Sequence, residues 1–205
     1  MIVKIHHEVI MYNPINDKFF PCKMNGKINQ VPMHEILLGN IKAVPYHPDP
    51  ALEAFLRYMP SIFLQALDLS LNENEYTDLI TGGTESDCFP AYQAQVELKL
   101  KQKIDIFQVF PDRNGFFLHN DVREEKSPKT DLDTLLIHSA SGNNPIHHRA
   151  ANSLQQICIS CALITLIHHN NFCLAGTVGH SNVRGQTCYF CMIHEEDPFQ
   201  RMILN

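Results

Sequence analysis

Cys88 is the residue of this sequence that is best placed to act as a nucleophile. It follows a Gly82-Gly83 loop and opens a stretch with helical spacing that runs to about residue 103. A helix N-terminus stabilises a thiolate through its free backbone N–H groups and its dipole. Glu85 and Asp87 act in the opposite direction, because nearby negative charges raise the pKa of a thiol. The alternative is a cysteine that only packs against the first helical turn.

A thiol nucleophile needs a histidine as its base and usually a carboxylate or amide that orients the imidazole. We predict a catalytic trio of Cys88, His180 and Asp197, with His138 as the alternative base and Asn182 as the alternative orienting residue. The chain order of thiol, imidazole and carboxylate resembles that of papain-like cysteine peptidases and deamidases. In those folds the thiol opens a helix and the other two residues lie on a later sheet. The resemblance covers this order alone, because no further signature of those families occurs.

Two Cys-x-x-Cys pairs, Cys158 with Cys161 and Cys188 with Cys191, form a second candidate site of the kind that holds zinc. The first pair lies in the apolar run ICISCALITLI and the second in the strand-like segment TCYFCMI. Residues three apart on a strand face opposite sides, so the second pair cannot reach one ion without a bulge. A variant combines the first pair with His168. Reduced, packed cysteines are the preferred interpretation, and no cofactor is predicted.

Other functions lack their sequence signals. Neither common phosphate-binding glycine motif occurs, nor does a Gly-x-Ser-x-Gly elbow. The net charge is −6, whereas a sequence-independent nucleic-acid binder needs Lys and Arg gathered on one face. We therefore expect no nucleic-acid partner. The longest apolar run, at 157–167, is well short of the roughly 20 residues that span a bilayer, so no membrane span is expected.

The elements expected around these residues are of mixed type. Alternating patterns bounded by turn residues predict strands, and apolar positions at helical spacing predict helices. The expected strands are 2–12, 18–22, 104–110, 115–120, 132–138, 172–178 and 187–193. The expected helices are 33–39, 50–69 with a kink or split at Pro60, 87–103 and 152–169, the last of them buried at the centre. Turns are expected at 13–17 and at Asn25-Gly26, and a loop at 70–87.

Strands joined by hairpin-like turns, with helices outside strict alternation, indicate an α+β fold. We expect a mainly antiparallel sheet of about five to seven strands packed with three or four helices. The 205 residues fit a single globular domain, 1–205, with a soft internal boundary near residue 80. No signal peptide is evident, which predicts a cytoplasmic protein, although a dedicated export machine would need no such signal.

The sharpest functional hypothesis is a thiol-dependent enzyme that acts on an amide or thioester bond, such as a cysteine protease, deamidase or acyltransferase. The alternative is a non-catalytic domain that binds another protein. A zinc-binding module is a third hypothesis. Under the first two hypotheses the expected partner is another protein, as substrate or as binding partner.

Overall fold

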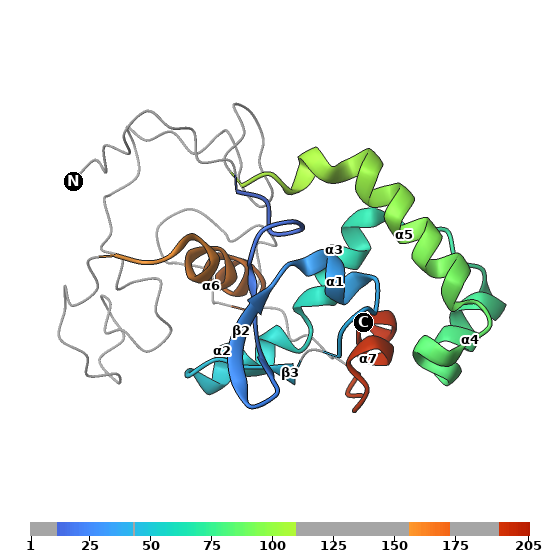
Figure 1. The fold of residues 1–205 in the computed structure, drawn as a ribbon, viewed down its shortest axis with the longest axis horizontal. Helices are drawn as coiled ribbons and strands as arrows, with labels where there is room; N and C mark the ends of the chain where they lie inside the picture. Colours follow the sequence, from blue (N-terminus) through green and yellow to red (C-terminus); the bar gives the residue numbers. More distant parts are fainter. Residues whose placement is uncertain (1–11, 43, 110–155, 173–192) are drawn as a thin grey trace. The chain divides into compact units, whose positions relative to one another are not determined.

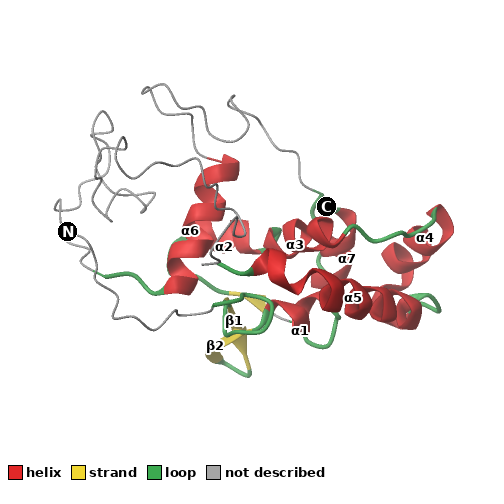
Figure 2. Cartoon of the chain, turned by 90° about the horizontal axis from the view of Figure 1, so that it is seen from above, coloured by secondary structure: helices red, strands yellow, loops and turns green. Residues whose placement is uncertain are grey.

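The computed structural model describes residues 12–42, 44–109, 156–172 and 193–205. These residues divide into two compact units. The first unit takes the described parts of Met1–Pro48, Leu56–Asp121 and Met192–Asn205, and the second takes those of Asp49–Phe55 and Val122–Cys191. Helices make up most of the described chain (Figure 2). The expected single domain with its soft boundary near residue 80 stays a prediction.

The described elements follow one another in this order (Figure 1): β1 (Phe20–Met24), β2 (Lys27–Val31), α1 (Met33–Leu37), β3 (Val44–Pro45), α2 (Pro50–Leu56), α3 (Met59–Leu67), α4 (Glu73–Gly82), η1 (Gly83–Glu85), α5 (Phe89–Lys103), η2 (Ile104–Phe107), α6 (Ile159–Phe172) and α7 (Pro198–Leu204). The elements η1 and η2 are short 3₁₀ turns. The second unit holds α6 and most of α2. Among the described residues, no helix has the length and apolar character that a membrane crossing requires.

The strands form one antiparallel sheet in the order β2-β1-β3. Asn25 and Gly26 make the two-residue turn between β1 and β2, with φ values of 50° and 76°. Both values are positive, as the tightest hairpin turns require. Along β1, Phe20 and Cys22 are buried and Lys23 is exposed. The sheet therefore has one face on the core and one exposed face.

This three-stranded sheet corrects the expected sheet of five to seven strands. The expected strand at 18–22 corresponds to β1, but the one at 104–110 begins with η2. The chain leaves α5 directly into this 3₁₀ turn, in which residues three apart lie on the same side, and Phe107 becomes fully buried. The remaining expected strands lie wholly or almost wholly outside the described residues: 2–12, 115–120, 132–138, 172–178 and 187–193.

The expected helices at 33–39, 50–69, 87–103 and 152–169 are confirmed as α1, the α2–α3 pair, α5 and α6. Of the kink or split expected at Pro60, the structure has the split, because α2 ends at Leu56 and α3 begins at Met59. The last helix begins at Ile159, later than expected. The sequence analysis did not predict α4 or α7.

The expected loop at 70–87 contains α4 and η1. The Asn72 side chain accepts hydrogen bonds from the backbone N–H groups of Asn74 and Glu75, and the Glu75 carboxylate accepts one from the backbone N–H of Asn72. This capping box satisfies donors that a helix start otherwise leaves free. The Asn-x-x-Glu spacing is present in the sequence, but the polar composition of the region favours a loop.

The core of the first unit contains two clusters of aromatic rings. Phe63 of α3 is fully buried, and its ring centroid lies 5.7 Å from that of Phe19 and 5.8 Å from that of Phe107. A second aromatic cluster joins α5 to α7, where Tyr92 and Phe199 have ring centroids 5.2 Å apart. The core therefore holds together segments that are far apart in the sequence.

The start of α1 is held by the turn at 13–17. With five residues, α1 is too short to satisfy its own backbone groups. The N–H of Met33 donates to the carbonyl of Pro14 at 2.9 Å, and the N–H of His34 donates to the carbonyl of Ile15 at 3.2 Å. The turn that the sequence predicts at 13–17 is confirmed and serves as the N-terminal support of α1.

The end of α1 is held by side chains of α5. The hydroxyl of the buried Tyr92 donates to the carbonyl of Leu37 at 2.7 Å, and the amide of Gln93 donates to the carbonyl of Leu38 at 2.8 Å. Burial raises the pKa of Tyr92, so its hydroxyl stays protonated and remains a donor. Gly39, at a φ of 67°, then turns the chain away.

The described part of the second unit consists of residues 49–55, which include most of α2, and residues 156–172, which include α6. The apolar side chains buried in it are Leu52, Phe55, Leu163, Ile164 and Ile167. The ring of Phe55 meets that of His168 edge-on, with 5.2 Å between centroids. The helix expected at 152–169 as a buried helix corresponds to α6, and only part of it is buried.

Candidate functional site

Cys88 lies directly before α5, as the sequence predicts, but a carboxylate lies beside it. The backbone N–H of Cys88 donates to Oδ2 of Asp78 at 3.1 Å, and the Ser86 hydroxyl donates to the same oxygen at 2.7 Å. These hydrogen bonds hold the pKa of Asp78 below its usual range. Hydrogen bonding to Asp78 raises the pKa of the Cys88 thiol, and burial and the charges of Asp78, Glu75 and Asp87 raise it further. The expectation that the Cys88 thiol has a low pKa is therefore wrong.

Cys88 should alkylate more slowly than an ordinary thiol near neutral pH, because the raised pKa depletes the reactive thiolate. Asp78→Asn should speed the reaction several-fold, since it removes the largest cause of the raised pKa. Asp87→Asn is the matched control and should change the rate less. Peptide mapping by mass spectrometry after iodoacetamide pulses across pH measures these rates. A Cys88 rate that reaches its plateau by about pH 7 would contradict this prediction.

Asp197 caps α7. Its Oδ1 accepts from the backbone N–H groups of Phe199 at 2.9 Å and Gln200 at 3.1 Å, and its Oδ2 lies 3.3 Å from Nζ of Lys42. The rings of Phe199 and Phe89 meet edge-on, with 5.3 Å between centroids, so the starts of α5 and α7 lie side by side. The carboxylate that we expected to orient a histidine therefore serves as a helix cap and an ion-pair partner.

The histidines and the alternative residues of the expected trio, His180, His138 and Asn182, lie outside the described residues. Their predicted roles beside Cys88 therefore stay predictions. The second cysteine pair, Cys188 with Cys191, also lies outside the described residues.

The first cysteine pair lies at the start of α6. The backbone N–H of Cys161 donates to Sγ of Cys158 at 3.2 Å. Burial, followed by hydrogen bonding to Cys158, raises the pKa of Cys161 to about 12. Within the described ranges, no group of three or more His, Cys, Asp or Glu side chains could hold a metal ion. A zinc site that uses Cys158, Cys161, Cys188 and Cys191 therefore stays a prediction.

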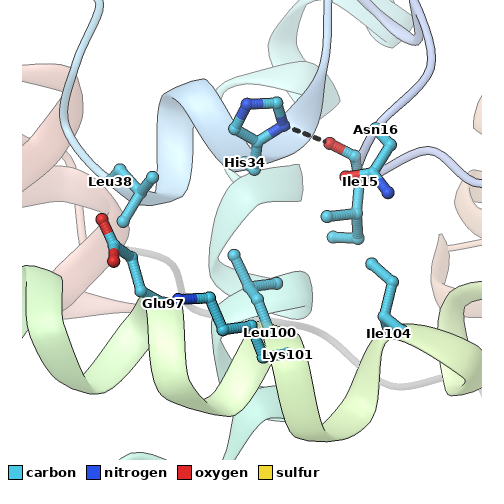
Figure 3. Close-up of a pocket in the computed structure, with 8 residues that line it drawn as sticks. All are labelled: Ile15, Asn16, His34, Leu38, Glu97, Leu100, Lys101 and Ile104. Carbon is cyan, nitrogen blue, oxygen red and sulfur yellow. Dashed lines mark hydrogen bonds between the residues drawn. The ribbon is translucent and has the colours of Figure 1, made fainter.

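A cavity of about 500 Å³ lies in the first unit between α1 and the C-terminal part of α5 (Figure 3). Its apolar lining consists of Ile15, Leu38, Leu100 and Ile104, and its polar lining of Asn16, His34, Glu97 and Lys101. The amide of Asn13 joins two sides of the cavity, because it donates to the carbonyl of Ile104 at 2.9 Å from within the 13–17 turn. The cavity is thus built where that turn, α1 and α5 meet.

His34 has a fixed orientation in this cavity. Its Nδ1 lies 2.6 Å from the carbonyl oxygen of Ile15, as Figure 3 shows. A carbonyl only accepts, so Nδ1 carries the hydrogen. The other ring nitrogen, Nε2, lies 3.2 Å from Oε1 of Glu35. The imidazole is therefore held by α1 and the turn.

The two charged residues of the lining stand one turn apart on α5. In the part of the chain that the structure describes, neither the Glu97 nor the Lys101 side chain has a hydrogen bond or an ion pair. Lys103 differs, because its Nζ donates to the carbonyls of Ala66 at 3.3 Å and Leu67 at 3.0 Å. The lining includes no Ser, Thr or Cys, so the cavity suits binding better than covalent catalysis. The four-residue spacing of Glu97 and Lys101 was the only signal of this cavity in the sequence.

The family comparison decides the class of protein. Residues 13–205 match the family model of the CRISPR-associated protein Cse1. The chain belongs to the Cse1 family. This membership corrects the hypothesis of a thiol-dependent hydrolase or transferase, because the Cse1 family is CRISPR-associated and not a class of thiol enzymes. The alternative hypothesis, a non-catalytic binding domain, is compatible with a Cse1 chain.

Solved Cse1 structures are similar in fold. CasA (Cse1) of Thermus thermophilus has a TM-score of 0.59 and 21% sequence identity, and the match covers 82% of this chain and 33% of that one. Cse1 of Thermobifida fusca has a TM-score of 0.59 and 15% identity, with coverages of 81% and 31%. This chain therefore spans about a third of the length of these structures. A comparison with curated proteins gave no match.

Cse1 membership also overturns the expectation of no nucleic-acid partner, because a nucleic-acid partner is expected for a CRISPR-associated protein. The expectation rested on the net charge of −6. Net charge sums over the whole chain and does not exclude a local basic surface. The expectation also rested on the lack of a basic stripe in the sequence, whose densest cluster is Lys99, Lys101 and Lys103. The order of residues along the chain does not show which lysines the fold brings together.

Proposed function

We propose that this chain is a non-catalytic binding part of a Cse1-type subunit in a CRISPR assembly of protein, guide RNA and target DNA. The family match over residues 13–205 carries the proposal. In CRISPR effectors of the best-known type, base pairing with the guide reads most of the target, and protein supplies backbone contacts and reads a short flanking motif. The cytoplasmic location expected from the sequence is part of this proposal.

A lysine-rich segment supports a nucleic-acid contact, and the strand register places its Lys23 and Lys27 on opposite faces of the hairpin. Residues 18–31 contain three lysines and no acidic residue, although the whole chain is acidic. All three, Lys18, Lys23 and Lys27, are exposed. The last two lie on β1 and β2, close to the tight turn between these strands. Exposed lysines without neighbouring acids can neutralise phosphates and release counterions, so this β1–β2 hairpin is the surface to test first.

The test adds this protein to the other subunits of the assembly, loaded with guide RNA. Fluorescence anisotropy across a salt series then measures binding to a labelled target duplex. We expect tighter binding with this protein present. Lys23→Gln and Lys27→Gln should each weaken binding a few-fold and reduce the salt slope by about 1, because each removes one phosphate contact.

Lys99→Gln on α5 is the matched control, since it removes one positive charge outside residues 18–31. Affinity and salt slope should match the wild type in this variant. Target binding that is the same with and without this protein would refute the proposed function. Equal salt slopes for the hairpin variants and Lys99→Gln would instead exclude the hairpin as the contact surface.

A further inference from the structure

The cavity between α1 and α5 has an aliphatic lining that suits an apolar guest. Ile15 is 1% exposed, Leu100 8% and Leu38 9%. A volume of about 500 Å³ is ample for a large apolar side chain with its adjoining backbone. Of the side chains on which nucleobases usually stack, the eight lining residues include only His34, whose ring is held by the carbonyl of Ile15. The lining therefore favours a protein side chain over a base.

The charges of the lining give the site a polarity. Glu97 precedes Lys101 by four residues, so both project from one side of α5 (Figure 3). Both are exposed and, among the described residues, make no ion pair. A guest with a carboxylate would meet Lys101, whereas a second acid placed one helical turn earlier would be repelled by Glu97. The two charges therefore favour a partner whose apolar anchor has an acidic residue on the Lys101 side and no acidic residue on the Glu97 side.

Apolar surface continues outside the cavity. Leu98 is 54% exposed and precedes Lys101 by three residues, which makes the two neighbours on the helix surface. Ile106 is 44% exposed and follows Ile104 by two residues. A small ligand inside the cavity would leave both in water. A protein partner would cover them, as interfaces with a buried anchor and a charged rim do.

We propose that this cavity docks another protein subunit of the assembly. One large apolar side chain of that subunit fills the space between Leu38, Leu100 and Ile104, and an acidic residue beside it pairs with Lys101. That the partner belongs to a CRISPR assembly rests on the proposed function. The aliphatic lining, the unpaired charges and the exposed Leu98 stand independently of it.

The first test probes the cavity without any partner. The protein, labelled at Ile and Leu methyl groups, is titrated with N-acetyl-leucine and separately with the uncharged N-acetyl-leucinamide. We expect saturable shifts at the Ile15, Leu38 and Ile104 methyls, with affinities in the millimolar range that so small a ligand allows. The carboxylate probe should bind several-fold more tightly than the amide. Lys101→Gln should abolish this difference, and Lys99→Gln should preserve it.

The absence of saturable shifts would overturn the proposal, because the cavity would then not accept an apolar anchor. A single-stranded oligonucleotide that shifts the same methyls more strongly than either leucine probe would overturn it too, since the site would then bind nucleic acid. A preference for the carboxylate probe that survives Lys101→Gln would remove Lys101 from the pairing.

The second test uses the assembly. Affinity of the protein for the other subunits should fall about tenfold in Lys101→Glu, because a like charge then faces the partner's acid, and less than about twofold in Lys99→Glu. If the wild-type protein binds the other subunits and the two variants have equal affinities for them, the proposed docking site is overturned. Failure of the wild-type protein to join the assembly would refute the proposed function, and the leucine titration then decides on the cavity by itself.

Discussion

Phe63→Ala should lower the free energy of unfolding by about 3–5 kcal/mol, as truncation of a buried aromatic ring does. The ring is 0% exposed and lies between Phe19 and Phe107, at 5.7 and 5.8 Å between centroids. Alanine would leave a void between α3, η2 and the segment that leads into β1. Neither neighbouring ring can fill the void without leaving its own packing. Urea unfolding of the full chain, followed by circular dichroism, measures the loss.

Leu98→Ala on α5 is the control for this truncation. It also removes a large apolar side chain, but one that is 54% exposed. It should change stability by no more than about 0.5 kcal/mol. A loss below about 1 kcal/mol for Phe63→Ala would show that this aromatic cluster does not stabilise the first unit as its burial implies.

Gly39→Ala should cost about 2–4 kcal/mol, because two penalties act at one residue. The φ of Gly39 is 67°, a left-handed conformation that an L-residue adopts at a cost of about 1–2 kcal/mol. A Cβ would also lie 2.9 Å from Cζ of Phe89 and 3.2 Å from Cγ2 of Thr84. The Phe89 ring is packed against Phe199 and cannot move away freely.

Gly26→Ala separates the two penalties. Gly26 has a φ of 76°, but a Cβ there meets nothing within 4 Å. This variant should lose only the backbone penalty of about 1–2 kcal/mol. Urea midpoints of the two variants, compared in one series, measure the difference. Equal losses would mean that the ring of Phe89 yields at no cost, which would contradict the close packing at the end of α1.

The spacing of apolar residues in the sequence identified those helices whose buried side chains form a stripe along one side. In α3 the buried residues Met59, Phe63 and Leu67 are each four apart, and in α5 Tyr92, Val96 and Leu100 repeat the spacing. Such stripes are the signal on which helix prediction depends. The helix α4 buries only Leu79, so it has no stripe, and the capping box was its one clear mark. The run IDIFQVF is short and apolar, a case in which periodicity does not distinguish strand from helix.

The surroundings of Cys88 could not be derived without α4. The sequence correctly placed Cys88 at the start of α5, yet its pKa is governed by Asp78, ten residues earlier. Asp78 reaches the thiol only because residues 73–82 are helical. The cavity is harder still to predict, since it joins residues 15, 34 and 100 from three separate segments. Local patterns do not show which distant segments come together.

The dependence of α1 on its neighbours has a consequence for the order of folding. The carbonyls of its last residue, Leu37, and of its C-cap, Leu38, accept hydrogen bonds from Tyr92 and Gln93, each 55 residues later in the chain. The isolated segment has little tendency to nucleate a helix, since one short turn fixes many dihedrals for few hydrogen bonds. We therefore expect α1 to become fully ordered during synthesis only once α5 is available. The wall that Leu38 gives to the cavity is completed at that same late step, so nascent or truncated chains lack this binding surface.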